Sequence, residues 1–299
     1  MTTQDTNRAS AYGLDEANVL LLTVDCCRAD TFEMANLPFI KSLGRPARAR
    51  TAGTFTLPAH MAFFGGYLPI DQASREPYYN PNVRQLWRLK SGRSRDLNSV
   101  GIMLDGNNVL EGYRNLGYHT IGTGGVRWFR NAMLQRLFDE FHFYGPDDQT
   151  SVFAERRRSD LALNRADEIL ERLSNKRRWF LFVNCLETHV PYDTGNGELT
   201  ARTKEIMARG QQIWGCKSPS FDNVDISQKE LQSLHKLQVT ALESIDAKVE
   251  KLIKSLPKPL LVIITGDHGE CFGENMFWGH GYPHPKVTEV PLLITVLEK

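Results

Sequence analysis

Five short, largely apolar stretches limit what this chain can fold into. They lie at residues 18–25, 118–123, 179–185, 260–265 and 291–296. Stretches of this length with no regular polar face are typical of strands buried on both sides, as in a parallel sheet. Helical patterns lie between them, at residues 38–43, 58–66, 108–116, 159–173 and 228–256. Because strands alternate with helices, we predict an α/β fold with a mostly parallel sheet and helices on both faces.

The size and composition of the chain fit one folded unit. The 299 residues are 41% hydrophobic and 24% charged, which is enough to bury a core and excludes disorder across most of the chain. Residues 90–98 and 193–225 have the composition of loops, and the sequence contains no internal repeat. We expect residues 1–17 to form a flexible leader and residues 18–299 to form a single domain.

Charge and cysteine content argue against several classes of protein. Lys and Arg total 36 and Asp and Glu total 35, so the formal net charge is +1, and bulk charge does not favour nucleic acid or a membrane surface as a partner. The five cysteines lack C-x-x-C spacing, which argues against a disulfide framework or a zinc ribbon. No apolar stretch is long enough to cross a membrane. The polar N-terminus does not resemble a signal peptide, so we expect a cytoplasmic protein.

Polar residues follow three of the predicted strands at the point where each strand ends. Asp25 ends the first, Glu187 and His189 follow the third, and Asp267 and His268 follow the fourth. In open α/β sheets, ligands bind at the edge formed by the carboxyl ends of the strands. Carboxylates and imidazoles are ligands of divalent ions such as zinc and manganese, so this edge is a candidate metal site.

Thr56 is a candidate fourth member of that site. It lies two residues before Pro58, which is favoured at the first position of a helix. The positive end of the helix dipole and a bound cation would both favour the alkoxide form of Thr56, which could then act as a nucleophile. The alternative is that Thr54 or Thr56 only caps the helix.

Four segments together resemble the alkaline phosphatase superfamily. They are VDCCRAD at 24–30, TFTLPAHMAFFGGYLP at 54–69, GDHGECFGENMFWGHG at 266–281 and TEVPLLI at 288–294. More narrowly, they resemble the sulfatase-like branch, which includes arylsulfatases, phosphonate monoester hydrolases, lipoteichoic acid synthases and phosphoethanolamine transferases. The resemblance implies an alkaline-phosphatase-like three-layer sandwich whose mostly parallel sheet has helices on both faces. It also implies an enzyme that uses a divalent metal, zinc or manganese, and acts on ester bonds.

The resemblance also implies a role for individual residues. Asp25, Asp267 and His268 match metal ligands, and Thr56 matches a nucleophile that is itself a ligand. His280 and His189 match catalytic histidines that contact the transferred group or protonate the leaving group. We expect His60 and His284 to be further substrate contacts, and Arg28 and Glu270 to support the site.

Several positions depart from the pattern of the branch. Sulfatases that form formylglycine carry C-x-P-S-R where this chain has Thr56-Leu-Pro-Ala-His60. The usual sulfatase chemistry is therefore not expected. A threonine at this position resembles the nucleophile of phosphodiesterases and phosphotransferases. Cys26 stands where a second acid is common, and His268 stands where calcium-dependent members have Asn, which favours zinc or manganese. The sequence ends at Lys299, so we expect the usual C-terminal subdomain to be missing.

Two questions about the metal site stay open from the sequence. A second ion could be held by His189, Asp193 and His284, or these histidines and His280 could contact phosphate around a single ion. The adjacent cysteines, Cys26 and Cys27, could add a soft ligand or could be a buried structural pair.

We therefore expect a metal-dependent hydrolase or transferase of phosphoric ester bonds, a phosphodiesterase or phosphomonoesterase with a phospho-threonine intermediate on Thr56. The substrate would be a small-molecule or polymer-linked phosphoester. One alternative is a sulfate-ester or phosphonate hydrolase, and another is a non-catalytic metal-binding accessory protein. The sequence names neither the substrate nor the oligomeric state.

Overall fold

The apolar stretches form the centre of a seven-stranded sheet in the order β2-β9-β6-β1-β5-β3-β4. This computed structural model describes residues 16–65, 108–130, 132–145, 161–195, 199–214 and 226–298. The strands are β1 (Asn18–Val24), β2 (Ala47–Arg50), β3 (His119–Gly124), β4 (Glu140–Phe143), β5 (Trp179–Cys185), β6 (Leu260–Gly266) and β9 (Glu289–Leu297). Strands β6, β1, β5, β3 and β4 are parallel to one another, whereas β9 and β2 are antiparallel to their neighbours.

Side chains alternate between the two faces of the sheet, so each central strand contributes to two cores. On β1, Leu20 and Leu22 pack into one hydrophobic cluster, while Val19 and Leu21 pack into another on the opposite face. Burial on both sides explains why β1 has no polar face in the sequence.

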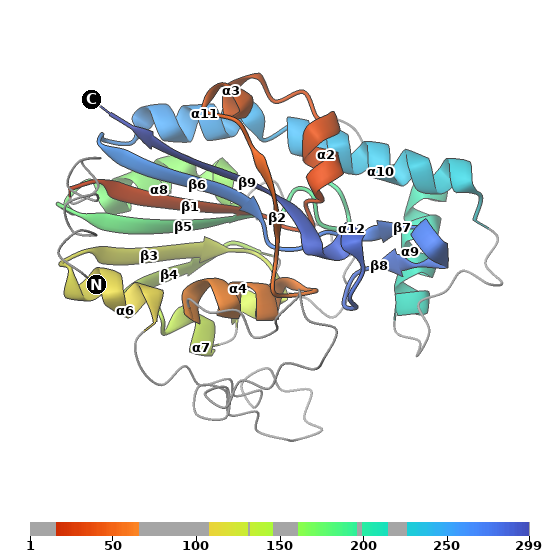
Figure 1. The fold of residues 1–299 in the computed structure, drawn as a ribbon, viewed down its shortest axis with the longest axis horizontal. Helices are drawn as coiled ribbons and strands as arrows, with labels where there is room; N and C mark the ends of the chain where they lie inside the picture. The colour runs from red at the N-terminus through yellow and green to blue at the C-terminus, as the bar shows by residue number, and fades with distance from the viewer. Residues whose placement is uncertain are drawn as a thin grey trace.

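Helices cover both faces (Figure 1). The first cluster is completed by α2 (Ala29–Met34), α3 (Pro38–Ser42), η3 (Ala162–Arg165), α8 (Ala166–Leu173), α10 (Gln228–Glu243) and α11 (Asp246–Ser255). The second is completed by α4 (Thr56–Gly65), α6 (Val109–Asn115), η1 (Arg127–Arg130) and α7 (Ala132–Gln135). The predicted three-layer, mostly parallel α/β fold is therefore confirmed.

A smaller unit adjoins the carboxyl ends of the central strands (Figure 1). It contains a two-stranded hairpin, η4 and two helices, namely β7 (Cys271–Phe272), η4 (Glu274–Met276), β8 (Trp278–Gly279), α12 (Pro285–Thr288) and α9 (Ala201–Trp214). Trp278 of β8 lies against Gly210 of α9, where a Cβ atom would come within 2.3 Å of the indole ring. The hairpin, α9 and α10 share a third hydrophobic cluster.

The structure corrects several predicted elements. Residues 201–214, expected to lie in a loop, form α9, on which Ile206 and Met207 are buried. The single helix predicted over 228–256 is two helices, α10 and α11. Two strands of the large sheet, β2 and β4, and the two hairpin strands, β7 and β8, were not predicted. β2 is an exposed edge strand with the sequence ARAR, and charged side chains are typical of such edges.

Other predictions fall outside the described residues. These are the leader, except for its last two residues, and the loop at 90–98. The single domain over 18–299 stays a prediction. Among the described residues, no helix has both the length and the apolar character needed to span a membrane.

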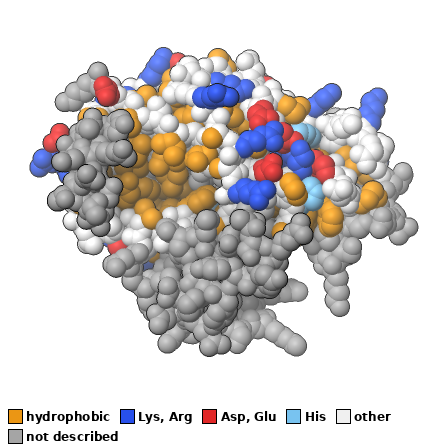
Figure 2. All heavy atoms as spheres, in the orientation of Figure 1, with side chains coloured by type: hydrophobic (Ala, Val, Ile, Leu, Met, Phe, Trp, Pro, Cys, Tyr) orange, Lys and Arg blue, Asp and Glu red, His pale blue; other side chains and the backbone are white. Residues whose placement is uncertain are grey.

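An apolar cavity opens on the face of the sheet that carries α4 and α6. Its volume is about 310 Å³, and Leu21, Phe63, Phe180, Ile263 and Leu292 are among its lining residues. Figure 2 shows the apolar side chains gathered on this face. None of the described lining residues carries a carboxylate, an imidazole or a thiol, so these residues do not form a metal site.

Candidate active site

The register of the sheet brings two acids together. Val24, the last residue of β1, pairs with Gly266, the last residue of β6, so Asp25 and Asp267 follow neighbouring strand ends. Both carboxyl groups are fully buried. Oδ1 of Asp267 accepts hydrogen bonds from the backbone amides of His268 at 2.9 Å and Cys26 at 3.1 Å. The two loops that follow β1 and β6 are thereby joined.

Thr56 and His268 complete a group of side chains around these acids. Thr56 is the first residue of α4 and is buried. Its Oγ1 lies 3.4 Å from Oδ2 of Asp25 and 3.5 Å from Nε2 of His268. The same Nε2 lies 3.5 Å from Oδ2 of Asp267. We call Asp25, Thr56, Asp267 and His268 the ligand cluster.

The ligand cluster fits a divalent cation. With metal–ligand bonds of about 2.1 Å, the ligands of a tetrahedral ion lie about 3.4 Å apart, close to the distances from Thr56 Oγ1 to its two neighbours. Oδ2 of Asp267 is buried and has no hydrogen-bond partner among the described residues. His268 donates from Nδ1 to the carbonyl of Gly269 at 2.9 Å, which leaves the lone pair of Nε2 directed at the cluster.

Burial shifts the ionisation of the ligand cluster. Desolvation raises the pKa of Asp25 to about 7, and the nearby charge of Asp267 adds to the effect. Desolvation also raises the pKa of Asp267 to about 8. The pKa of His268 falls to about 4, chiefly because the ring is buried and also because His280 is close. Two adjacent buried acids are costly as a charged pair, and a cation would relieve that cost.

His280 and His189 face the ligand cluster from two loops. The ring of His280 lies 4.4 Å from that of His268 and 5.9 Å from that of His189, measured between centroids. Desolvation lowers the pKa of His280 to about 4. His189 is half-buried and donates from Nδ1 to the carbonyl of Val190 at 2.6 Å. The structure thus brings two of the four predicted substrate histidines to the site.

His60 is placed differently from the prediction. Its ring is fully buried and donates from Nδ1 to the carbonyl of Thr56 at 2.7 Å, while Nε2 accepts from the hydroxyl of Thr23 at 3.1 Å. Burial lowers the pKa of His60 to about 3, so the ring is neutral. Because both nitrogens bond within the protein, His60 supports the turn that carries Thr56 and has no ring nitrogen left to offer to a substrate.

His284 and Asp193 are also placed away from the predicted roles. His284 caps α12 by accepting from the amide of Lys286, and it contacts Cys271 and Asn275. Asp193 accepts from the amide of Gly195 at 2.7 Å. Among the described residues, neither joins a group that could hold a metal. The predicted second site of His189, Asp193 and His284 is therefore not assembled.

The predicted supporting residues hold the loop after β6. Arg28 is buried and pairs with Asp30 at 2.6 Å and Glu274 at 2.7 Å. Oε1 of Glu270 accepts from Tyr192 at 2.8 Å and from Gln238 at 2.9 Å. Desolvation raises the pKa of Glu270 to about 7.

Sequence reasoning missed two polar residues of the site. Gln238 lies on the buried side of α10 and donates to the carbonyls of Cys26 and Thr188 as well as to Glu270. Asn184, near the end of β5, donates to Oδ2 of Asp25 at 3.4 Å. The sequence signal for Gln238 was a glutamine among the apolar positions of a long helix. The sequence signal for Asn184 was an asparagine inside an apolar strand.

Comparison with known proteins identifies the family of the chain. The sequence model of the Sulfatase family matches residues 50–297, so the chain belongs to that family. The match includes Thr56, Asp267, His268 and His280, whereas Asp25 precedes it. Both the predicted family and the predicted class, an enzyme that acts on ester bonds, are confirmed.

Solved structures share the fold at low sequence identity. The phosphonate monoester hydrolase of Agrobacterium radiobacter is 15% identical, with a TM-score of 0.60 over 93% of this chain and 68% of that one. The C-terminal periplasmic domain of the phosphoethanolamine transferase EptC from Campylobacter jejuni is 14% identical, with a TM-score of 0.55 over 94% and 79%. The lipoteichoic acid synthase LtaP from Listeria monocytogenes is 12% identical, with a TM-score of 0.54 over 99% and 71%. Comparison with curated protein sequences finds no match.

Proposed function

We propose that this sulfatase-family protein is a metal-dependent hydrolase or transferase of phosphoric esters, with Thr56 as its nucleophile. The observation that carries the proposal is the position of Thr56 Oγ1, 3.4 Å from Oδ2 of Asp25 and 3.5 Å from Nε2 of His268 at the first turn of α4. A hydroxyl that only caps a helix does not require a buried acid and a buried imidazole beside it.

The ligand cluster would hold the metal. Two carboxylates, one imidazole and one hydroxyl oxygen favour zinc or manganese over calcium, which prefers oxygen ligands alone. When bound, such an ion withdraws negative charge from the transferred group and lowers the pKa of the Thr56 hydroxyl. A structurally similar protein, the periplasmic domain of EptC from Escherichia coli, has been solved as a zinc complex, at 15% identity and a TM-score of 0.53.

The protein's own residues supply the remaining steps. Thr56 donates toward Oδ2 of Asp25, which is an acceptor for the hydroxyl proton. The Thr56 oxygen then bonds to phosphorus as the bond from phosphorus to the leaving alcohol breaks, and a phospho-threonine forms. Water or a second alcohol resolves this ester, giving hydrolysis or transfer.

His280 and His189 are suited to contact the phosphoryl oxygens. A buried neutral imidazole donates a hydrogen bond without bringing a charge into the site. The negative charge of a bound phosphoryl group would raise the pKa of His280, and the ring could then protonate the leaving alcohol.

The same geometry also accommodates a sulfate ester or a phosphonate. The Sulfatase family match and the similarity to phosphonate monoester hydrolases favour keeping both as alternatives. The absence of a cysteine at position 56 favours phosphorus over sulfur. A non-catalytic metal-binding protein is disfavoured, because nucleophile, ligands and both histidines lie together in one site.

Metal analysis followed by a substrate panel tests the proposal. Wild type and the Asp267→Asn/His268→Ala variant are compared by elemental analysis and then assayed on nitrophenyl phosphate, phosphodiester, phosphonate and sulfate esters. We expect the variant to lose about one ion per chain and all turnover of the phosphoesters. Metal bound by wild type without turnover of any ester would instead support a binding protein.

A further inference from the structure

Two polar side chains lie side by side on the face of the sheet that carries α4. Thr23 of β1 pairs in register with Asn184 of β5, and both side chains are fully buried. The residues two and four positions before each of them are apolar and pack in the second hydrophobic cluster. Because buried polar groups are placed where they find hydrogen-bond partners, the partners of these two residues indicate why they are there.

Hydrogen bonds connect the two side chains to the nucleophile on one side and to Asp25 on the other. Nδ2 of Asn184 donates to Oγ1 of Thr23 at 3.0 Å and to Oδ2 of Asp25 at 3.4 Å. Oγ1 of Thr23 donates to Nε2 of His60 at 3.1 Å. Nδ1 of His60 donates to the carbonyl of Thr56 at 2.7 Å. The hydroxyl of Thr56 lies 3.4 Å from Oδ2 of Asp25 and closes the circuit. We call these five residues the polar ring.

The atoms themselves decide which group donates in each bond. A carbonyl oxygen only accepts, so the neutral imidazole of His60 carries its proton on Nδ1 and accepts at Nε2. Thr23 therefore donates to His60 and accepts from the amide of Asn184. Reversing that amide would place its oxygen against the carboxylate of Asp25, which is also an acceptor. One assignment of donors and acceptors thus fits the whole polar ring.

The amide of Asn184 is placed for its donors. Nδ2 makes two bonds within the polar ring, whereas the buried Oδ1 has no hydrogen-bond partner among the described residues. A buried acceptor without a partner destabilises a folded protein. The position of this side chain therefore favours the orientation of Asp25 over the satisfaction of its own oxygen.

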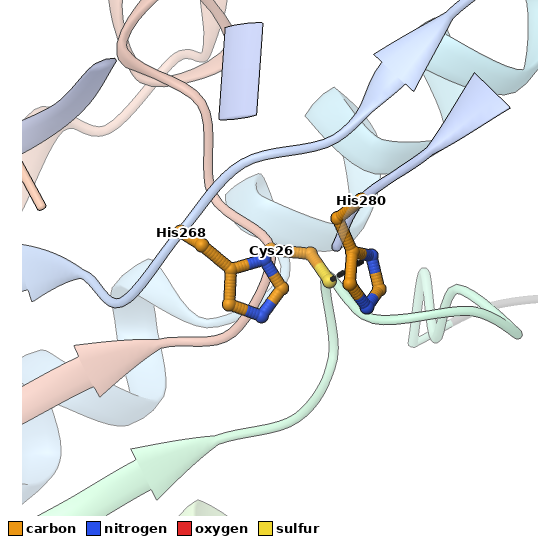
Figure 3. A group of neighbouring side chains, drawn as sticks. All are labelled: Cys26, His268 and His280. Carbon is orange, nitrogen blue, oxygen red and sulfur yellow. Dashed lines mark hydrogen bonds between the residues drawn. The ribbon is translucent and has the colours of Figure 1, made fainter. Parts of the chain in front are cut away.

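The two oxygens of Asp25 have different surroundings. Oδ1 lies 3.4 Å from Sγ of Cys26 and 3.8 Å from Nε2 of His268. Figure 3 shows that sulfur between the rings of His268 and His280. Oδ2 is the oxygen that belongs to the polar ring, and it faces the hydroxyl of Thr56. The polar ring therefore acts on the oxygen that accepts the Thr56 proton in the proposed reaction.

We propose that the polar ring fixes the nucleophile relative to its proton acceptor, with His60 and Asn184 as positioning residues coupled through Thr23. His60 holds the turn that carries Thr56, and Asn184 holds the carboxylate of Asp25. Because the hydroxyl of Thr23 joins the two, a displacement at one end is transmitted to the other. Displacements of about 1 Å can lower a rate about 10²-fold. This role rests on the proposed function, since it prepares Thr56 for its reaction.

Thr23→Val separates coupled positioning from two independent supporting roles. Valine has the shape of threonine without the hydroxyl, so the link is lost while His60 still bonds to Thr56 and Asn184 still bonds to Asp25. Full-length proteins are assayed with saturating zinc and the phosphoester that wild type turns over. We expect kcat to fall about 10–100-fold, with KM and metal content close to wild type. Thr23→Ser restores the hydroxyl and should recover most of kcat.

Thr123→Val is the matched control. Thr123 is a fully buried threonine of β3 that donates to the carbonyl of Phe182 at 3.3 Å, outside the polar ring. This variant should lose stability and keep the kcat of wild type. If Thr23→Val behaved in the same way, its hydroxyl would only support the fold, and the proposal would be overturned.

Asn184→Ala and His60→Asn test the coupling from its two ends. Each variant opens the polar ring at one place, and asparagine at position 60 lacks an acceptor where Nε2 lies. Because one break already uncouples the ends, the double variant should lose little more kcat than the more damaged single variant. Losses that multiply would show that the two residues act separately, which contradicts the proposal.

The tautomer of His60 tests the polar ring without any turnover. Nuclear magnetic resonance of the ring nitrogens at neutral pH should show the proton on Nδ1 and none on Nε2. A proton on Nε2 would overturn the proposal even in an active enzyme, since Thr23 could then not donate to it. The expected tautomer with no turnover of any ester would support the polar ring and refute the proposed function. Wild-type turnover that Thr23→Val leaves unchanged would refute the positioning role alone.

Discussion

Gln238 of α10 donates from Nε2 to Oε1 of Glu270 at 2.9 Å, and this bond ties a helix of the outer layer to the loop that carries the site. The same amide group donates to the carbonyls of Cys26 and Thr188, and its Oε1 accepts from Thr31 at 2.8 Å. One side chain thus holds the loops after β1, β5 and β6 together. Oε2 of Glu270 in turn lies 3.8 Å from Nδ1 of His280.

Gln238→Leu should weaken both stability and activity. The variant leaves buried oxygens of Cys26, Thr188 and Glu270 short of a donor, at a cost of about 2–4 kcal/mol in the free energy of unfolding. We also expect kcat to fall more than the metal content, because His280 would lose its support while the ligand cluster remains. Urea denaturation, kinetics and elemental analysis measure the three effects.

Gln232→Leu is the matched control, since Gln232 lies exposed on the same helix. It should leave stability and kcat close to wild type. If the two variants were equally stable, the buried amide of Gln238 would not have the structural role assigned to it.

Arg28→Ala should destabilise the fold much more than Arg48→Ala. Arg28 is buried and pairs with Asp30 and Glu274, and removing one partner of a buried pair costs about 3–5 kcal/mol. Arg48 pairs with Glu33 at 2.6 Å but both are exposed, and such pairs contribute about 0–1 kcal/mol. Thermal unfolding at constant metal concentration compares the two, and equal losses would contradict the buried role of Arg28.

The central strands and the strand-end acids were predictable because they depend on local pattern. Strands buried on both faces have no polar side, so β1, β5 and β6 stand out as apolar stretches. Neighbouring parallel strands end at one edge, which placed Asp25 near Asp267 and His268. Thr56 was predictable because the start of α4 is marked by a nearby proline.

Roles that depend on where a side chain points, or on contacts between residues far apart in the sequence, were not predictable. His60 follows Thr56 by four residues on α4, so its ring lies over the preceding turn and bonds to the Thr56 carbonyl. His284 directly precedes Pro285 and caps α12. Gln238 reaches the site from a helix that begins well over a hundred residues after β1. The substrate class and the cytoplasmic location stay predictions.

Thr56→Ala should abolish turnover while the fold persists. Loss of a nucleophile typically lowers kcat by about 10³–10⁶-fold, and Thr56→Ser should recover part of the activity because the hydroxyl is restored. A substrate whose intermediate breaks down slowly should leave a covalent phosphoryl group on the peptide that contains Thr56, detectable by mass spectrometry.

Thr54→Ala is the control for this prediction. Thr54 lies in the same turn, and its described contact is made by the backbone, whose carbonyl accepts from Gly281 at 2.8 Å. Its activity should stay near wild type. Full activity of Thr56→Ala would refute the assignment of the nucleophile.

His235 should make stability depend on pH. Its ring stacks on Phe272, with 5.0 Å between the ring centroids. Nε2 of His235 lies within hydrogen-bonding distance, 2.9 Å, of the hydroxyl oxygen of Thr31. Burial, with a smaller contribution from Arg28, lowers the pKa of His235 to about 4. Between pH 4 and 6.5, the unfolded chain binds a proton at this residue that the folded chain does not, so its contribution to stability is complete above pH 6.5 and is lost as the pH falls.

Denaturation of wild type and His235→Gln at pH 5 and pH 7.5 isolates this contribution. Since the ring is partly exposed, solvent reduces the effect, and we expect wild type to lose about 1 kcal/mol more than the variant between the two values. The difference between the proteins is the relevant quantity, because the other buried histidines, His60, His268 and His280, contribute equally to the pH dependence of both. If the two proteins lost equal stability, His235 would be as readily protonated in the folded state as in the unfolded chain. The packing against Phe272 would then not exclude water from the ring.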